Sequence, residues 1–187
     1  MKRLLFVRHG ATVGNQEHRY IGRTDEPLSP VGIEQAHCLQ KEKLKADFLF
    51  VSPMLRTRQT AAIAFPSMEM HLIRDFRETD FGTFEGKTAA ELSNDKSYQE
   101  WLSTFCQGPI PNGENVSDFK CRCCKAFSLC VEEIPDTCCG AFVVHGGVIM
   151  SILERYVLPH QDFYDFHIPN GGWIASLWEK DSIKIEL

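Results

Sequence analysis

The chain has 187 residues, of which 43% are hydrophobic and 24% are charged, and its formal net charge is −5. These values fit one globular domain with a single core, and they exclude global disorder and fibrous repeats. A mildly acidic chain is poorly suited to binding nucleic acid through phosphate neutralisation, but one local basic pocket can still bind a small anion.

The apolar run at the N-terminus is short. Lys2 and Arg3 precede four apolar residues, and Arg8 then interrupts the run. This run is shorter than the ~7–15 apolar residues that a secretory signal needs, and no stretch of the chain approaches the ~20 of a membrane-spanning helix. We therefore expect a cytoplasmic protein without a membrane partner.

Strands and helices alternate along most of the chain. Short apolar runs predict buried strands, and the Ser-Pro pairs at 29–30 and 52–53 predict helix starts, with serine as the cap. The expected strands are 3–7, 47–51, 68–73, 141–144, 173–178 and 182–187. The expected helices are 30–44, 53–65, 88–104, 117–134 and 147–157, with a loop over 74–87. This order predicts a single α/β domain over residues 1–187, a three-layer sandwich whose mostly parallel central sheet is flanked by helices.

The eight cysteines are expected to be reduced and structural. Six residues recur at spacings of three and four and predict the buried stripe of a helix: Val116, Phe119, Cys123, Phe127, Cys130 and Ile134. A zinc ribbon would need a second C-x-x-C after Cys121 and Cys124, and Cys138-Cys139 does not supply it. A cysteine-based metal or redox module remains an alternative, which metal analysis under reducing conditions would test.

Polar side chains follow four of the predicted strands. Each strand is followed by one of these groups: Arg8-His9-Gly10, Ser52-Pro53 with Arg56 and Arg58 beyond it, Arg74 with Arg77 and Glu78, and His145-Gly146-Gly147. Because sites in α/β sheets form at the carboxyl ends of strands, these groups should share one cationic rim.

Such a rim suits a phosphoryl group. Arginine offers paired donors that match phosphate oxygens, and a neutral histidine is a competent nucleophile toward phosphorus. A nearby glutamate can protonate the leaving oxygen. The sequence carries no P-loop and no H-x-x-x-H or D-x-D pair, so we expect neither a metal nor another cofactor.

Five ordered blocks resemble the histidine phosphatase superfamily, also called the phosphoglycerate mutase-like group. They span residues 8–15 (R-H-G-A-T-V-G-N), 20–29, 52–61 (S-P-M-L-R-T-R-Q-T-A), 78–86 and 144–149. The resemblance covers nearly the whole chain and implies the phosphoglycerate mutase-like fold.

The resemblance also implies roles for individual residues. His9 would be the nucleophile that becomes phosphohistidine, and Glu78 the general acid and then the base for the attacking water. Three further side chains would hold the phosphoryl oxygens: Arg8, Arg56 and His145. Five residues would bind substrate: Thr12, Asn15, Arg23, Thr24 and Gly146.

The resemblance predicts a metal-independent phosphomonoester hydrolase acting on a small phosphorylated metabolite. In size and in its 20–29 block, the chain looks most like the bacterial α-ribazole phosphatases of cobalamin biosynthesis, so α-ribazole 5′-phosphate is the expected substrate. Residues 85–116 would form an excursion that caps the pocket. Two alternatives remain, a phosphoglycerate mutase-type transferase and a non-catalytic phospho-ligand binder, and the oligomeric state is open between monomer and homodimer.

Overall fold

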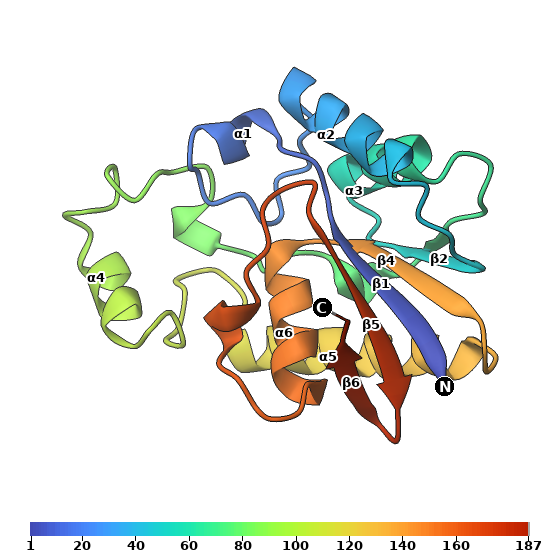
Figure 1. Cartoon of the computed structure of the whole chain (residues 1–187). Helices are drawn as coiled ribbons and strands as arrows, with labels where there is room; N and C mark the ends of the chain where they lie inside the picture. Colours follow the sequence, from blue (N-terminus) through green and yellow to red (C-terminus); the bar gives the residue numbers. More distant parts are fainter. Residues whose placement is uncertain (187) are drawn as a thin grey trace.

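The computed structural model describes residues 1–186, and a six-stranded sheet lies at its centre (Figure 1). In spatial order the strands are β3 (His71–Leu72), β2 (Phe48–Val51), β4 (Cys139–Val144), β1 (Lys2–Arg8), β5 (Trp173–Glu179) and β6 (Ser182–Ile185). The first four run parallel, whereas β5 and β6 are antiparallel to their neighbours. The predicted α/β class with a mostly parallel sheet is confirmed.

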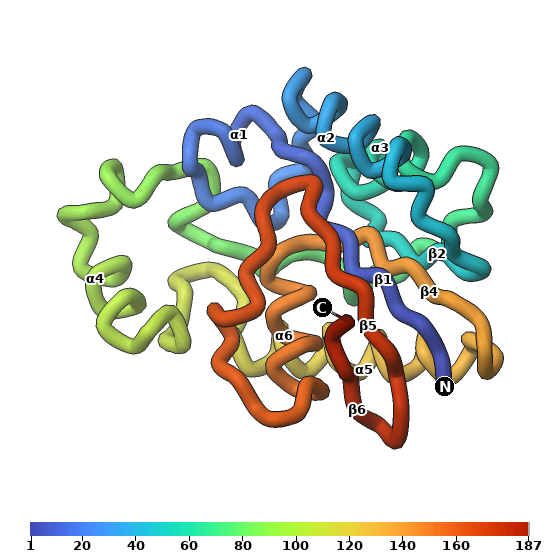
Figure 2. The backbone as a smooth tube through the Cα atoms, in the orientation of Figure 1, coloured from blue at the N-terminus to red at the C-terminus, as the bar shows by residue number. Residues whose placement is uncertain are grey.

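Helices cover both faces of the sheet (Figures 1 and 2). On one face lie α2 (Pro30–Lys41) and α3 (Leu55–Ala64), and on the other lie α5 (Val116–Glu133) and α6 (Gly146–Tyr156). Side chains of β1 alternate between two cores: Leu4 and Phe6 pack under α5 and α6, while Leu5 and Val7 pack under α2 and α3. Because both faces of β1 are buried, its sequence is a continuous apolar run. The three-layer arrangement is thereby confirmed.

The two Ser-Pro pairs behave differently. Ser29 caps α2 as predicted, because its hydroxyl accepts a hydrogen bond from the N–H of Gly32. Ser52 is not a cap, since α3 begins only at Leu55 and Met54 occupies the cap position. The prediction of a helix start at residue 53 was therefore two residues early, and the Ser52 hydroxyl is left for another partner.

Several predicted elements are shorter than expected. The strand expected over 182–187 ends at Ile185, and its last expected residue, Leu187, lies outside the described residues. The helix expected over 88–104 is only α4 (Lys96–Ser103), because the Asp95 side chain accepts hydrogen bonds from two N–H groups of the first turn and fixes the start there. The strand expected over 68–73 is reduced to the two residues of β3. The helix expected to reach residue 44 ends at Lys41.

The structure also contains short helices that the apolar pattern did not indicate. They are α1 (Val13–Gln16) and the 3₁₀ helices η1 (Arg74–Phe76), η2 (Gly82–Phe84) and η3 (Phe163–Phe166). Each spans three or four residues, which is too short to establish a period.

Residues 85–116 form an arm around α4 that extends away from the sheet (Figure 1). The arm has its own small core, made of Phe84, Leu92, Tyr98, Trp101 and Ile110. Phe105, just beyond α4, is 83% exposed. Within the described part of the chain, no helix is both long and apolar enough to span a bilayer.

The eight cysteines are all free thiols. The predicted stripe on α5 is confirmed, with Cys123 and Cys130 buried in the core beneath the helix. Burial raises the pKa of the Cys130 thiol to about 12, so this side chain behaves as a small hydrophobic group. Among residues 1–186, no group of three or more His, Cys, Asp or Glu side chains is arranged to hold a metal ion.

Candidate active site

Two histidines face each other at the carboxyl ends of neighbouring strands. His9 follows β1 and His145 follows β4, and the parallel pairing of these strands places Arg8 opposite Val144. The two imidazole rings are buried, their centroids lie 5.1 Å apart, and their planes are inclined by 67°. The strand-end rule thus brings together two side chains that are more than 130 positions apart in the sequence.

The environment of His9 defines one tautomer. Its Nδ1 atom lies 2.7 Å from the carbonyl oxygen of Gly10, and because a carbonyl can only accept, Nδ1 carries the proton. Burial, reinforced by the positive charge of Arg56, holds the pKa of His9 well below its ordinary value. The ring is therefore neutral near pH 7, and its Nε2 atom bears a free lone pair.

His145 is held from the opposite side. Its Nε2 atom lies 2.8 Å from the hydroxyl of Ser52, the serine that does not cap α3. Burial and the charge of Arg56 also depress the pKa of His145, so this ring is neutral as well. Its Nδ1 atom is buried without a hydrogen-bond partner in the protein. With the serine hydroxyl donating to Nε2, Nδ1 carries the proton and can donate it to a ligand.

Arg56 lies almost completely buried in the first turn of α3. Its two terminal nitrogens donate to the carbonyls of Gly22 and Thr24 at 2.9 and 2.8 Å. Its Nε atom has no partner in the protein. Burial lowers the pKa of Arg56 and the charge of Glu78 opposes that shift, but from a starting value above 12 the guanidinium remains cationic.

Arg8, at the end of β1, has the same pattern. One terminal nitrogen donates to the carbonyl of Ile168 at 2.7 Å and lies 3.2 Å from Nε2 of His167. Its buried Nε atom is without a partner, as in Arg56. Gly146 lies against this guanidinium: a Cβ atom at that position would lie 3.3 Å from Cζ of Arg8. The close approach explains a glycine at the first position of α6.

Glu78 lies at the N-terminus of α6. Its carboxylate accepts hydrogen bonds from the N–H of Gly147 at 3.1 Å and from its own neighbour Thr79 at 3.0 Å. Its charge acts on both Arg8 and Arg56, so it belongs to the same site. A Cβ atom on Gly147 would collide with this carboxylate, which accounts for the second glycine of the pair.

The remaining predicted site residues lie in different surroundings. Asn15 lines the pocket, where its Oδ1 accepts from the Thr12 N–H and from Asn170. Thr12 itself caps α1 through its hydroxyl. Arg23 is exposed and pairs with Asp80 at 3.4 Å. Thr24 is also exposed, and only its carbonyl touches Arg56. Asn15 therefore lies on the cavity wall with Arg8 and Glu78, and Asn170 links it to the carbonyl of His9. Arg23 is not on that wall, and Thr12 and Thr24 make contacts with neighbouring backbone.

A cavity of about 280 Å³ opens beside this cluster. Arg8, Asn15, Glu78 and Gly146 lie on its wall. The rest of the wall is largely apolar and includes Tyr20, Phe81, Trp101, Ile110, Phe119, Met150, Phe163 and Tyr164. The arm over residues 85–116 contributes to it through Trp101 and Ile110.

Comparison with known proteins agrees with this geometry. The family model described as histidine phosphatase superfamily (branch 1) matches residues 4–187. The chain belongs to the histidine phosphatase superfamily.

Relatives within the superfamily carry different names. A putative phosphoserine phosphatase 2 from Hydrogenobacter thermophilus is 30% identical over 182 residues, covering 92% of this chain and 87% of that protein. A probable phosphoglycerate mutase from Yersinia pestis is 27% identical over 201 residues, covering 97% and 92%. A putative α-ribazole-5′-P phosphatase from Escherichia coli has a solved structure that superposes with a TM-score of 0.89 at 25% identity, covering 100% of this chain and 95% of that one. The superfamily is thus established, but these names do not agree on one substrate.

Four residues of this histidine phosphatase site were not among the predicted ones. Ser52 holds His145; its position directly after a strand placed it in the expected rim, but as a helix cap and not as a partner of His145. His167 and Asn170 reach the site from the irregular segment between α6 and β5, where no pattern in the sequence marks them. Arg122 on α5 contacts the loop that carries Glu78.

Proposed function

We propose that this protein hydrolyses small phosphomonoesters through a phosphohistidine formed on His9. One observation carries the proposal. Three buried nitrogens around the histidine pair have no partner in the protein: Nε of Arg8, Nε of Arg56 and Nδ1 of His145. Because unpaired buried donors are costly, the arrangement is suited to an anion that accepts from all three, and a phosphoryl group has the required oxygens.

In the first step, the lone pair on Nε2 of His9 attacks phosphorus. The P–N bond forms as the bond between phosphorus and the leaving oxygen breaks, and Glu78 gives its proton to that oxygen. Arg8 and Arg56 stabilise the charge that develops on the phosphoryl oxygens, while His145 donates from Nδ1. The carbonyl of Gly10 keeps the proton on Nδ1 of His9, so Nε2 stays free for attack.

In the second step, a water molecule attacks the phosphohistidine. The carboxylate of Glu78 takes a proton from that water, the new P–O bond forms, and the P–N bond breaks to return neutral His9 and inorganic phosphate. The proton that Glu78 takes from water replaces the one it gave to the leaving oxygen in the first step, so the enzyme ends as it began.

The wall of the cavity favours a leaving group that carries a ring and no negative charge. Apart from the phosphate-facing Arg8, the cation on the wall is Arg19, which is already bound to Glu17 at 2.7 Å and Glu91 at 2.9 Å. A substrate carboxylate would therefore find neutral donors but no free cation on this wall, whereas the aromatic side chains suit a base or sugar ring. This supports α-ribazole 5′-phosphate as the substrate, with residues 85–116 as the cap over the leaving group.

The proposal is tested by hydrolysis of p-nitrophenyl phosphate in EDTA, with wild type beside His9→Ala. We expect activity that survives EDTA and disappears in the variant. A panel of α-ribazole 5′-phosphate, phosphoserine and 3-phosphoglycerate then ranks substrates, and we expect the ring-bearing ester to have the highest kcat/KM.

Two other outcomes would contradict the proposal. Activity that persists in His9→Ala would remove His9 as the nucleophile. Isomerisation of 3-phosphoglycerate that requires a bisphosphate primer, without net phosphate release, would establish the mutase alternative instead.

A further inference from the structure

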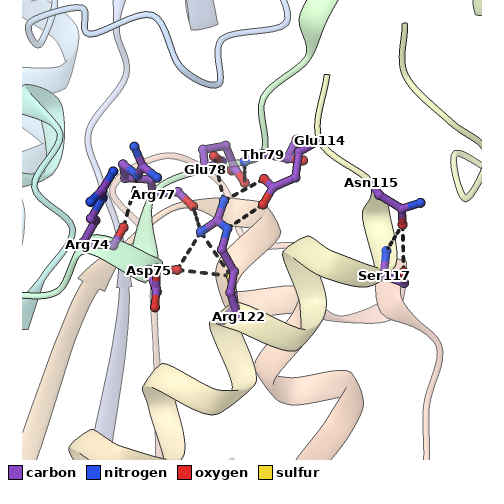
Figure 3. Close-up of polar contacts among 10 residues, drawn as sticks. Arg74, Asp75, Arg77, Glu78, Thr79, Glu114, Asn115, Ser117 and Arg122 are labelled. Atoms are coloured by element: carbon purple, nitrogen blue, oxygen red, sulfur yellow. Dashed lines mark hydrogen bonds and ion pairs between the residues drawn. The ribbon is translucent and has the colours of Figure 1, made fainter. Parts of the chain in front are cut away.

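Arg122 is the most fully hydrogen-bonded arginine near the site. It is absent from the wall of the cavity that Arg8 and Gly146 line, and lies with Glu114 in a second hollow that Glu78 also borders. It projects from α5, and Figure 3 shows its guanidinium between Glu114 and the loop that leads to Glu78. Its Nε and Nη2 atoms form a two-pronged ion pair with the Glu114 carboxylate at 2.6 and 2.8 Å. The side chains are only 17% and 20% exposed, so solvent screens the pair weakly.

The other donors of Arg122 are directed at backbone. Nη1 donates to the carbonyls of Asp75 at 2.6 Å and Arg77 at 2.8 Å, and Nη2 donates to the carbonyl of Glu78 at 3.2 Å. A guanidinium has five N–H donors, and these contacts with Glu114 and the loop use all of them. Arg122 thus donates hydrogen bonds to three carbonyls within residues 75–78, the gripped stretch.

The gripped stretch has little other support. Its first two residues belong to the 3₁₀ helix η1, where Phe76 is buried in the main core, but Arg77 and Glu78 lie in a segment without regular structure before Gly82. The Glu78 carboxylate is held by the N–H groups of Gly147 and Thr79, but these bonds orient its end and do not fix the backbone that carries it. A general acid must lie within hydrogen-bond reach of the leaving oxygen, and a displacement of 1 Å is enough to cost ~10²-fold in rate.

We propose that Arg122, held in place by Glu114, is a positioning residue for Glu78. It fixes the backbone of Asp75, Arg77 and Glu78 so that the carboxyl group meets the leaving oxygen. The inference rests on the proposed function, because it assumes that Glu78 is the general acid. In this role Arg122 does not contact the phosphoryl group, whereas Arg8 and Arg56 do.

The distinguishing readout is the dependence on the leaving group. Phenyl phosphate needs protonation of its leaving oxygen, whereas p-nitrophenyl phosphate has a stable leaving anion and needs it far less. We expect Arg122→Met to lower kcat for phenyl phosphate by ~10²-fold and for p-nitrophenyl phosphate by less than about tenfold. Inhibition by inorganic phosphate should be unchanged, since Arg122 does not line the phosphoryl site.

Two further variants keep the test independent of folding. Arg122→Lys retains the charge but lacks the fork that spans Glu114 and the carbonyls, so it should show the same selective loss, though smaller. Glu114→Gln keeps a side-chain oxygen that accepts from Nε of Arg122, but removes the negative charge that holds the guanidinium in place. Lys125→Met is the control: Lys125 lies on the same helix, is exposed, and does not line the cavity beside the histidines. We expect it to leave both substrates unaffected.

A double-mutant cycle decides the proposal. If Arg122 acts through Glu78, then adding Arg122→Met to Glu78→Gln should cost no further activity on phenyl phosphate. Equal losses on both substrates, or fully additive losses in the cycle, would overturn the positioning role. Failure of the proposed function has another signature, because wild type would then release no phosphate from either substrate or His9→Ala would remain active.

Discussion

Two arginines at the site use their hydrogen bonds differently. All the N–H donors of Arg122 form hydrogen bonds within the protein. In Arg56 only the terminal nitrogens do so, with the carbonyls of Gly22 and Thr24, and the buried Nε has no partner. A donor left free in a buried site is available to a ligand. The two residues should therefore differ in which substrates they affect.

Removal of Arg56 should impair every phosphomonoester alike. We expect Arg56→Met to lower kcat/KM by ~10²–10³-fold, because a preorganised donor aimed at developing charge is lost. The phosphoryl group is common to all substrates, so phenyl phosphate and p-nitrophenyl phosphate should suffer equal losses. Steady-state kinetics on both substrates check this.

Arg58→Met is the control for Arg56. Arg58 lies on the same helix and is exposed, so its loss should change neither rate. A loss below tenfold in Arg56→Met, with the fold intact by circular dichroism, would remove Arg56 from the phosphoryl site.

The strand-end argument predicted which side chains gather at the proposed site, because their position follows from topology. His9, Arg56, Glu78 and His145 each follow a strand of the parallel part of the sheet, and such strands end at one edge. Arg122 could not be found in this way, since its role depends on how α5 packs against a loop more than 40 residues earlier. Nor does sequence position tell whether a residue offers its side chain or its carbonyl, as Thr24 illustrates.

At the scale of helices and strands, local sequence patterns correctly predicted the elements that are buried in the main core. The continuous apolar strands and the stripe on α5 appear as expected. Their apolar side chains fill the two cores that lie between the sheet and the helices on either face. The pattern failed over 88–104, where Tyr98 and Trp101 pack in a separate cluster with Tyr20 and Phe81. Such a cluster depends on contacts distant in sequence, which a local period does not contain.

The arm over residues 85–116 also shows why the identity of the leaving group is harder to predict from sequence than the type of reaction. The phosphoryl site is built from strand ends, so its parts are fixed by the sheet. The cavity wall draws on α5 and α6, which were predicted well, but also on α4 and η3, which sequence patterns identified poorly or not at all. We therefore expect the choice of substrate to depend on this wall, including its residues from the arm, and not on the strand ends.

For the whole molecule, the buried histidines link stability to pH. Burial depresses the pKa of both His9 and His145 in the folded chain, whereas in the unfolded chain each titrates near its ordinary value of about 6.5. Below that pH the unfolded state binds more protons, so the free energy of unfolding should fall as pH falls. The slope is at most about 1.4 kcal/mol per pH unit for each histidine.

Urea unfolding at pH 7.5, 6.5 and 5.5 measures this slope. The double variant His9→Asn and His145→Gln keeps a donor toward Gly10 and a partner for Ser52 but does not titrate, so its profile should be flatter. A wild-type profile that is level over this range, or a double variant with the same slope, would contradict neutral buried histidines.

The most direct test of the account is to trap the phosphorylated protein. Wild type mixed with p-nitrophenyl phosphate and quenched rapidly in base should gain the mass of one phosphoryl group on the peptide that contains His9. That label should be stable to base and lost in acid, as expected of a phosphohistidine, and Glu78→Gln should accumulate it if removal of the base slows its hydrolysis. Turnover without any label, or a label that persists in His9→Ala, would contradict the proposed route.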